Sequence, residues 1–230
     1  MELDKYLAEL VGTFALVFIG AGAVTANAIT NGAVGIVGIA LAHGLVLMTM
    51  IYAVGHISGT HINPAVTISM IVTKNIKPMT GVMYIIFQLV GATLAGLLLG
   101  GIFTAAPAAV HLGTPALASG FSETSGLLLE TVLTFFLAFA IFGAAVDKRA
   151  APGFAGVAIG LVLTFDILMG GAFTGAAMNP ARAIGPAVAS GFWTSQWIYW
   201  VGPIIGAVVA GLYYSIVLVK KQQPQAKQLA

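Results

Sequence analysis

The sequence predicts an all-α membrane protein in which six transmembrane helices and two re-entrant half-helices form an inverted repeat. Three observations lead to this prediction. Only 7% of the 230 residues are charged and 59% are hydrophobic, whereas a soluble domain is about 25% charged and needs those charges to cover its surface. Several apolar stretches are long enough to cross a bilayer. The two halves of the chain also repeat one another, and each half carries one Asn-Pro-Ala motif.

The predicted spans follow from length, because a transmembrane helix needs about 20 mostly apolar residues. The segments that qualify are 7–29, 33–54, 79–103, 124–146, 154–172 and 195–219. Two shorter apolar segments, 63–72 and 179–189, cannot cross a bilayer, and both begin with Asn-Pro-Ala. We therefore expect each of these to be a half-helix that enters the membrane from one face and stops inside it.

The two halves of the chain are related in sequence. AELVGTFALVF at 8–18 matches LETVLTFFLAF at 129–139, which aligns Glu9 with Glu130. Each half holds three spans, an odd number, so the second half must cross the membrane in the opposite sense. Inverted repeats place the functional site near the midplane, where interrupted helices meet. The predicted organisation is one membrane domain, 1–230, with halves at about 1–115 and 116–220 and a polar tail at 221–230.

The basic residues predict the orientation. If the N-terminus is cytoplasmic, all but one of the nine lysines and arginines fall on the cytoplasmic side, as the positive-inside rule requires. These are Lys5, Lys74, Lys77, Lys148, Arg149, Lys220, Lys221 and Lys227. We therefore expect both termini in the cytoplasm, with the plasma membrane as the location. The exception is Arg182, and a charge inside a membrane is usually functional.

The two Asn-Pro-Ala motifs suit helix starts. Asparagine is a strong N-cap residue and proline fits the first helical turn, so the expected starts are Asn63, Pro64, Ala65 and Asn179, Pro180, Ala181. Their positive helix ends would face each other inside the membrane. Extended backbone at that depth is tolerated only when buried in protein or lining water. The carbonyls expected to line such a path are those of Gly59, Thr60, His61, Gly175, Ala176 and Ala177.

These features together resemble the aquaporin and aquaglyceroporin family, the major intrinsic proteins. The resemblance covers nearly the whole chain through HINPAVT, MNPAR, the paired glutamates and the arrangement of spans. It implies an aquaporin-like bundle with one pore per protomer, assembled as a homotetramer in the lipid bilayer. It also implies a passive channel for water that excludes protons and ions, needs no cofactor or metal, and is not an enzyme. Ammonia, hydrogen peroxide and glycerol are further candidate permeants.

The resemblance assigns roles to matching residues. The two asparagines, here Asn63 and Asn179, would donate side-chain N–H groups to a molecule at the pore centre. The paired glutamates, here Glu9 and Glu130, would accept backbone N–H groups from the loops that lead into the half-helices. Their role would be structural. The positive helix ends would repel cations, including hydronium.

The resemblance also implies a second constriction toward the outside, formed by His43, Ile167, Ala176 and Arg182. This set differs from that of strict water channels and is similar to that of plant tonoplast intrinsic proteins, several of which pass ammonia. An apolar Ile167 and a small Ala176 leave more room than bulkier polar residues would. Some tonoplast proteins add a loop histidine. Here the candidate is His111, for which an exposed loop histidine is the alternative.

Three sequence features favour the water branch of the family over the glycerol branch. Glycerol channels usually have an aspartate and a basic residue where this chain has Ala183 and Ala187. They also tend to have Pro-Leu in the sixth span, where this chain has Tyr199 and Trp200. Asp166 has no role in this interpretation, although it lies in a predicted span, where carboxylates are rare.

Two other classes of protein stay open at this stage. A secondary transporter can also have inverted repeats and broken helices, but it would need coupling-ion ligands, for which the chain offers little beyond Asp166. A structural junction protein with a vestigial pore is the second alternative, and the intact Asn63, Asn179 and Arg182 argue against it. The sequence shows no nucleotide loop or nucleophile–base pair, and with no cysteine it has no thiolate metal site.

Overall fold

The computed structural model describes residues 2–106 and 108–219, and within these ranges the chain is helical, with no strand. The long helices are α1 (Glu2–Ile29), α2 (Gly35–Ser58), α4 (Pro78–Ile102), α5 (Glu123–Ile141), α6 (Ala155–Thr174) and α8 (Ile198–Tyr213). The short elements are α3 (Pro64–Val72), α7 (Pro180–Ser190), η1 (Ala108–Gly113), and two π-helical turns, η2 (Phe142–Val146) and η3 (Tyr214–Val219), which extend α5 and α8.

The six predicted spans and both half-helices are confirmed, with ends that shift by a few residues. In the described part of the chain, six helices are long and apolar enough to cross a membrane. Their outer faces expose large apolar side chains such as Leu45, Val132 and Phe165, as a lipid-facing surface requires. The predicted polar tail at 221–230 lies outside the described residues, as do Lys220, Lys221 and Lys227.

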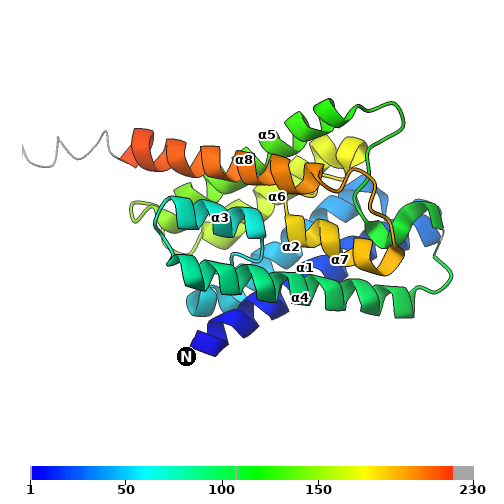
Figure 1. Ribbon diagram of the computed structural model, residues 1–230, viewed down its shortest axis with the longest axis horizontal. Helices are drawn as coiled ribbons and strands as arrows, with labels where there is room; N and C mark the ends of the chain where they lie inside the picture. The colour runs from blue at the N-terminus through cyan, green and yellow to red at the C-terminus, as the bar shows by residue number, and fades with distance from the viewer. Residues whose placement is uncertain (1, 107, 220–230) are drawn as a thin grey trace, which may run out of the picture.

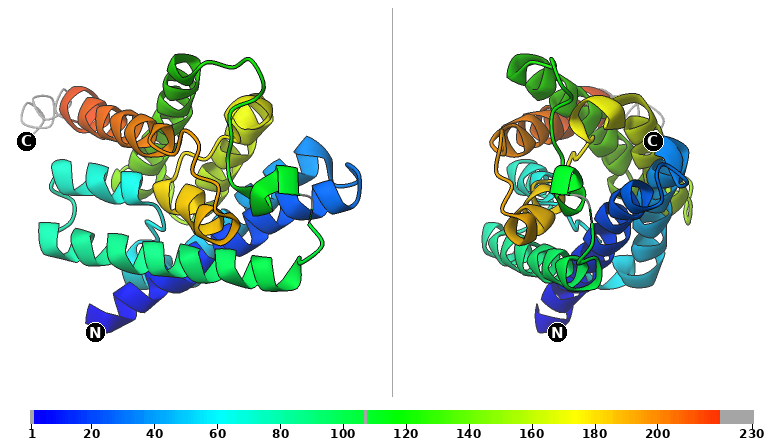
Figure 2. Two further views of the ribbon diagram at one scale, coloured as in Figure 1. Left: turned by 45° about the vertical axis from the view of Figure 1, so that its right-hand side comes forward. Right: turned by 90° about the vertical axis from the view of Figure 1, so that its right-hand side faces the viewer.

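The two half-helices lie end to end in the interior of the bundle. Figure 1 shows α3 and α7 between α4 and α8, and each of them packs on both of these long helices. The connection that carries η1 lies beside α7 in both views of Figure 2, and η1 contacts α7 and α1. The half-helices therefore meet at their N-terminal ends, and η1 covers the end of the molecule where α7 lies.

An approximate twofold axis relates the two halves. At the crossing of α2 and α6, a Cβ on Gly44 would lie 2.5 Å from the Gly160 carbonyl oxygen, and one on Gly160 would lie 2.6 Å from the Gly44 carbonyl oxygen. The two glycines thus make the same contact with each other. They are 116 residues apart (160 − 44), the same spacing as the asparagines of the two motifs (179 − 63). This spacing identifies equivalent residues in the two halves of the central region.

Each long helix that leads to a half-helix ends in the same way. The residue after α2 is Gly59 (φ 86°) and the residue after α6 is Gly175 (φ 84°), both in the left-handed region. Glycine adopts this conformation without strain, which makes it the common residue just beyond a helix end. Each chain then turns back through a short non-helical segment into the N-terminus of α3 or α7.

Candidate functional site

Both half-helices begin at an asparagine whose side chain caps its own helix. Asn63 is extended (φ −156°, ψ 118°), and its Oδ1 accepts a hydrogen bond from the Ala65 amide at 2.9 Å. Asn179 has nearly the same conformation (φ −152°, ψ 110°), and its Oδ1 accepts from the amides of Ala181 at 3.0 Å and Arg182 at 3.3 Å. The proline after each asparagine is the first helical residue, where a missing N–H leaves no bond unmade.

The two asparagines also tie the halves of the protein together. Asn63 Nδ2 donates to the Met178 carbonyl at 2.8 Å, and Asn179 Nδ2 donates to the Ile62 carbonyl at 2.9 Å. Each amide therefore bonds to the carbonyl of the residue that precedes the other asparagine. Since an amide nitrogen carries two hydrogens, this crossed pair leaves one hydrogen on each side chain for another acceptor.

Glu9 holds the loop that leads into α3. Its side chain is fully buried. Its Oε1 accepts from Ser58 Oγ at 2.7 Å and from the His61 amide at 2.9 Å. Its Oε2 accepts from the Ile62 amide at 2.6 Å and from Gln88 Nε2 at 2.7 Å. Hydrogen bonds to a carboxylate are stronger than those between neutral groups. This one side chain therefore fixes the loop between α2 and α3, in which the His61 and Ile62 amides have no hydrogen bonds within a helix.

Glu130 holds the loop that leads into α7 with an equivalent set of bonds. Its Oε1 accepts from Thr174 Oγ1 at 2.7 Å and from the Ala177 amide at 2.9 Å, and its Oε2 accepts from the Met178 amide at 2.7 Å. Glu130 is also fully buried. The two glutamates aligned in the sequence thus occupy equivalent positions on the two sides of the approximate twofold axis.

Sequence reasoning missed several residues that support these loops. Tyr84 Oη donates to the Ser58 carbonyl at 2.8 Å, and Tyr199 Oη donates to the Thr174 carbonyl at 2.8 Å. A signal for the tyrosines was present, because each precedes its repeated motif, GATLAG or GAVVAG, by the same interval. Gln88 has no equivalent in the second half, so comparing the repeats could not have found it.

His43 and Arg182 form a buried pair beyond the half-helix ends. His43 Nδ1 lies 2.8 Å from the Ile39 carbonyl oxygen. A carbonyl only accepts, so Nδ1 carries the hydrogen and Nε2 is the acceptor. Arg182 Nε and Nη2 both lie 3.4 Å from this Nε2, and Arg182 Nη1 donates to the Gly113 carbonyl at 2.6 Å. Gly20 makes room for the ring, since a Cβ there would lie within 2.9 Å of three imidazole atoms.

The other residues assigned to this constriction lie in different surroundings. Ile167 and Ala176 are buried in one hydrophobic cluster, and Ala176 has a left-handed backbone (φ 43°). The His111 ring stacks on Phe192 with ring centroids 3.8 Å apart and an angle of 9° between the planes. The connection that carries His111 reaches Arg182 through the Gly113 carbonyl, a contact that sequence reasoning did not anticipate.

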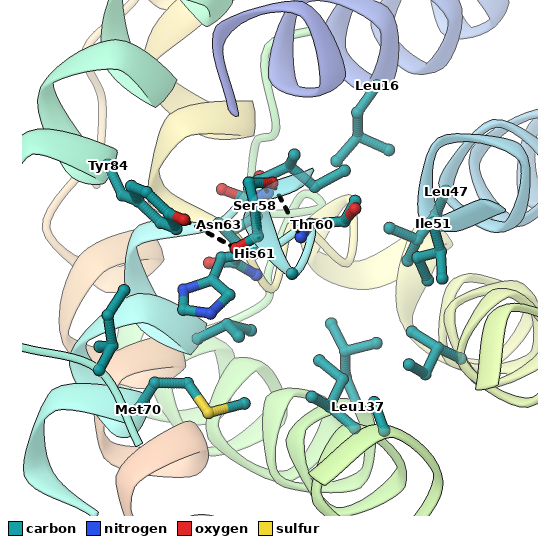
Figure 3. A pocket seen from close by; sticks show the side chains of 18 of the residues that line it. Leu16, Leu47, Ile51, Ser58, Thr60, His61, Asn63, Met70, Tyr84 and Leu137 are labelled. Atoms are coloured by element: carbon teal, nitrogen blue, oxygen red, sulfur yellow. Dashed lines mark hydrogen bonds between the residues drawn. The ribbon is translucent and has the colours of Figure 1, made fainter. Parts of the chain in front are cut away.

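A cavity of about 620 Å³ joins these parts. It runs from Glu2, Lys5 and Lys77 at one end to His43 and Arg182 at the other. Figure 3 shows its wall near Asn63, with Ser58, Thr60 and His61 on one side and Leu47 and Ile51 across the open space. The predicted residues that line it are His43, Gly59, Thr60, His61, Asn63, Ala177, Asn179 and Arg182, whereas Gly175, Ile167 and Ala176 do not.

A bundle of six spans, with a cavity lined by the asparagines of two opposed half-helices, defines a multi-pass membrane channel built as an inverted repeat. The chain belongs to the major intrinsic protein family, whose family description matches residues 1–214. That family consists of membrane channels and is not a family of enzymes.

Individual relatives agree with this assignment. The chain is 45% identical to aquaporin TIP4-4 of Zea mays over 216 residues, which cover 90% of this chain and 84% of the relative. It is 42% identical to aquaporin NIP1-1 of Zea mays over 219 residues, 94% of this chain and 75% of the relative. The X-ray structure of the aquaglyceroporin from Plasmodium falciparum shares the fold, with a TM-score of 0.85, 24% identity and coverage of 96% and 98% of the two chains.

Proposed function

We propose that this aquaporin-family channel conducts water passively and excludes protons and ions. The observation that supports this most directly is the crossed pair of asparagine amides, since Asn63 and Asn179 both line the cavity and each keeps one N–H hydrogen. A water oxygen can accept two hydrogen bonds and would be oriented by both amides. That water oxygen could then no longer accept a hydrogen bond from the next water molecule in a single file of waters. The break in the hydrogen-bonded chain of waters would prevent proton transfer along it.

Arg182 supports the exclusion of cations. Its partners described above, the His43 imidazole and the Gly113 carbonyl, are neutral acceptors, so the guanidinium keeps its positive charge at the end of the cavity. The N-terminal ends of α3 and α7 add about half a positive elementary charge each. Fixed positive charges and helix ends are the means by which narrow pores exclude cations and protons.

The function is tested by stopped-flow light scattering on proteoliposomes. Shrinkage against an impermeant osmolyte should be much faster than in empty liposomes, with a low activation energy and little re-swelling in glycerol. Flux linear in the gradient supports a channel, whereas saturation and a need for a coupling ion would indicate a secondary transporter. Asp166 is the residue to examine in that case, because its Oδ2 is buried and lacks a hydrogen-bond partner within residues 2–106 and 108–219.

We further propose that ammonia is a second permeant and that His43, which lines the cavity, and the apolar Ile167, which is buried in a hydrophobic cluster and does not line the cavity, both contribute to an outer constriction. In this structure the imidazole is bonded to Ile39 and Arg182 and lines the cavity. The double variant His43→Phe/Ile167→His should narrow the proposed constriction. Ammonia permeability should then fall by roughly tenfold relative to water permeability, the low end of what one altered contact changes in a pocket.

The control for this variant is His56→Phe, which removes an exposed histidine from the same helix, α2. It should leave both permeabilities unchanged. If the double variant has the same water permeability and the same ammonia permeability as the wild type, His43 and Ile167 do not form the proposed constriction. His111 can be tested in the same assay with His111→Ala.

The proposal extends to assembly and location. We propose one channel domain over residues 1–230, a homotetramer with one pore per protomer, and insertion in the plasma membrane with both termini in the cytoplasm. Tetramers are a general feature of the family. The distribution of lysine and arginine supports the orientation. Cross-linking in membranes would test the tetramer, and protease access to tagged termini would test the orientation.

A further inference from the structure

The twofold relation between the halves pairs the four residues assigned to the outer constriction with four residues of the other half. The spacing of 116 residues that relates Gly44 to Gly160 also gives, for each of these residues, the equivalent residue in the other half. The equivalent residues are Ile159 for His43, Ile51 for Ile167, Thr60 for Ala176 and Val66 for Arg182. All four equivalent residues line the cavity. We call Ile51, Thr60, Val66 and Ile159 the inner ring.

Thr60 is the one member of the inner ring with a polar side chain. Thr60 is only 7% exposed, and its Oγ1 is buried and has no hydrogen-bond partner within residues 2–106 and 108–219. Buried hydroxyl groups nearly always have a partner, so each exception calls for an explanation. The backbone amide of Thr60, in contrast, has a hydrogen-bond partner, because it donates to Ser58 Oγ at 3.0 Å.

The backbone of Thr60 adds a second reason to look for a role. Its φ is 49°, in the left-handed region, which is an outlier for a β-branched residue. Residues held in such conformations cluster at functional sites. The equivalent residue, Ala176, has a similar φ of 43° but no hydroxyl. The fold therefore accepts a small side chain here, and the hydroxyl of Thr60 is not needed to form the turn.

Figure 3 places Thr60 on the cavity wall close to Asn63, with Leu47 and Ile51 across the space. A molecule that passes this point meets apolar side chains from the rest of the inner ring. Backbone carbonyls can only accept hydrogen bonds, whereas a threonine hydroxyl can both donate and accept. A permeating molecule with a lone pair would give the Oγ1 hydroxyl the partner that it otherwise lacks.

We propose that Thr60 is a specificity-determining residue, and that its hydroxyl forms an inner binding position for water and other small neutral molecules that accept a hydrogen bond. This inference rests on the proposed channel function. The position lies between Asn63 and the end of the cavity at Lys77, so a molecule binds there either before or after it passes the asparagines.

The test compares Thr60→Val, which keeps the shape and removes the hydroxyl, with Thr60→Ser, which keeps the hydroxyl. In proteoliposomes with equal protein content, Thr60→Val should lower water permeability by about threefold to tenfold, the effect of losing one neutral hydrogen bond. Thr60→Ser should stay within about twofold of the wild type. The control is Thr49→Val, which removes an exposed hydroxyl bonded to the Leu45 carbonyl of its own helix.

Two results of the permeability assay would overturn the inference. One is a Thr60→Val channel as permeable as the wild type. The other is an equal loss in both Thr60 variants, which would indicate packing and not hydrogen bonding. A structure at a resolution that shows ordered water gives an independent measurement, with a water expected about 3 Å from Thr60 Oγ1. The absence of an ordered water near Oγ1 in that structure would contradict the binding position. Vesicles with the wild-type protein that shrink no faster than empty vesicles would contradict only the proposed function.

Discussion

Replacing Arg182 with valine should make the channel leak protons and monovalent cations. Arg182 is 3% exposed and lies at the end of the cavity. A unit charge about 4 Å from a cation is worth about 4 kcal/mol at an effective dielectric constant of 20. Even half of that energy changes a rate by about tenfold or more. The leak should therefore rise by at least about tenfold, measured as decay of a pH gradient in proteoliposomes.

Water permeability should change much less than the leak in this variant, because the asparagines and the inner part of the cavity stay in place. Arg149→Val is the matched control. It removes the same charge from an exposed site that pairs with Asp147 outside the membrane-spanning helices. If Arg182→Val and Arg149→Val leak at the same rate as the wild type, Arg182 does not carry the exclusion of cations.

Replacing Glu130 with glutamine should destabilise the fold strongly although the two side chains have the same shape. The carboxylate accepts three hydrogen bonds through both of its oxygens. Glutamine can accept through only one oxygen, and its NH₂ group would point at amide or hydroxyl donors. Breaking such a buried charged contact typically costs about 3 kcal/mol or more. The midpoint of thermal unfolding in detergent should fall by roughly 6–12 °C.

The control for this prediction lies about two turns earlier in the same helix. Glu123→Gln changes an exposed carboxylate at the start of α5 that accepts one hydrogen bond, from Ser195 Oγ at 2.6 Å. Its midpoint should move by no more than about 2 °C, since exposed contacts contribute little. Equal shifts for the two variants would mean that Glu130 does not hold the loop that leads into α7.

The fold was predictable because its determinants are local and repeated. Span length, the asparagine and proline at each half-helix start, and the odd number of spans in each half are all visible in the sequence. The sequence alignment of Glu9 with Glu130 matches two residues whose carboxylates both accept backbone N–H groups, because equivalent residues occupy equivalent positions across a twofold axis. Element ends differed by a few residues, since backbone bonds and not composition decide where a helix stops.

The surroundings of His43 and Arg182 were less predictable because their contacts join distant parts of the chain. Arg182 bonds to the carbonyl of Gly113, and any residue has a carbonyl, so no residue type could signal that contact. The tautomer of His43 depends on the Ile39 carbonyl one turn away and on space left by Gly20. Such features depend on how helices pack, which a pattern of apolar and polar residues does not specify.

The crossed bonds between Asn63 and Met178 and between Asn179 and Ile62 also bear on how the protein is made. The first half of the chain reaches the membrane before the second half is synthesised. Until then, the amide of Asn63 has no carbonyl to bind, and the cavity lacks half of its wall. The cavity is lined by residues of both halves, so its wall is complete only after the two halves have docked, and a chain of which only the first half is inserted does not yet contain it.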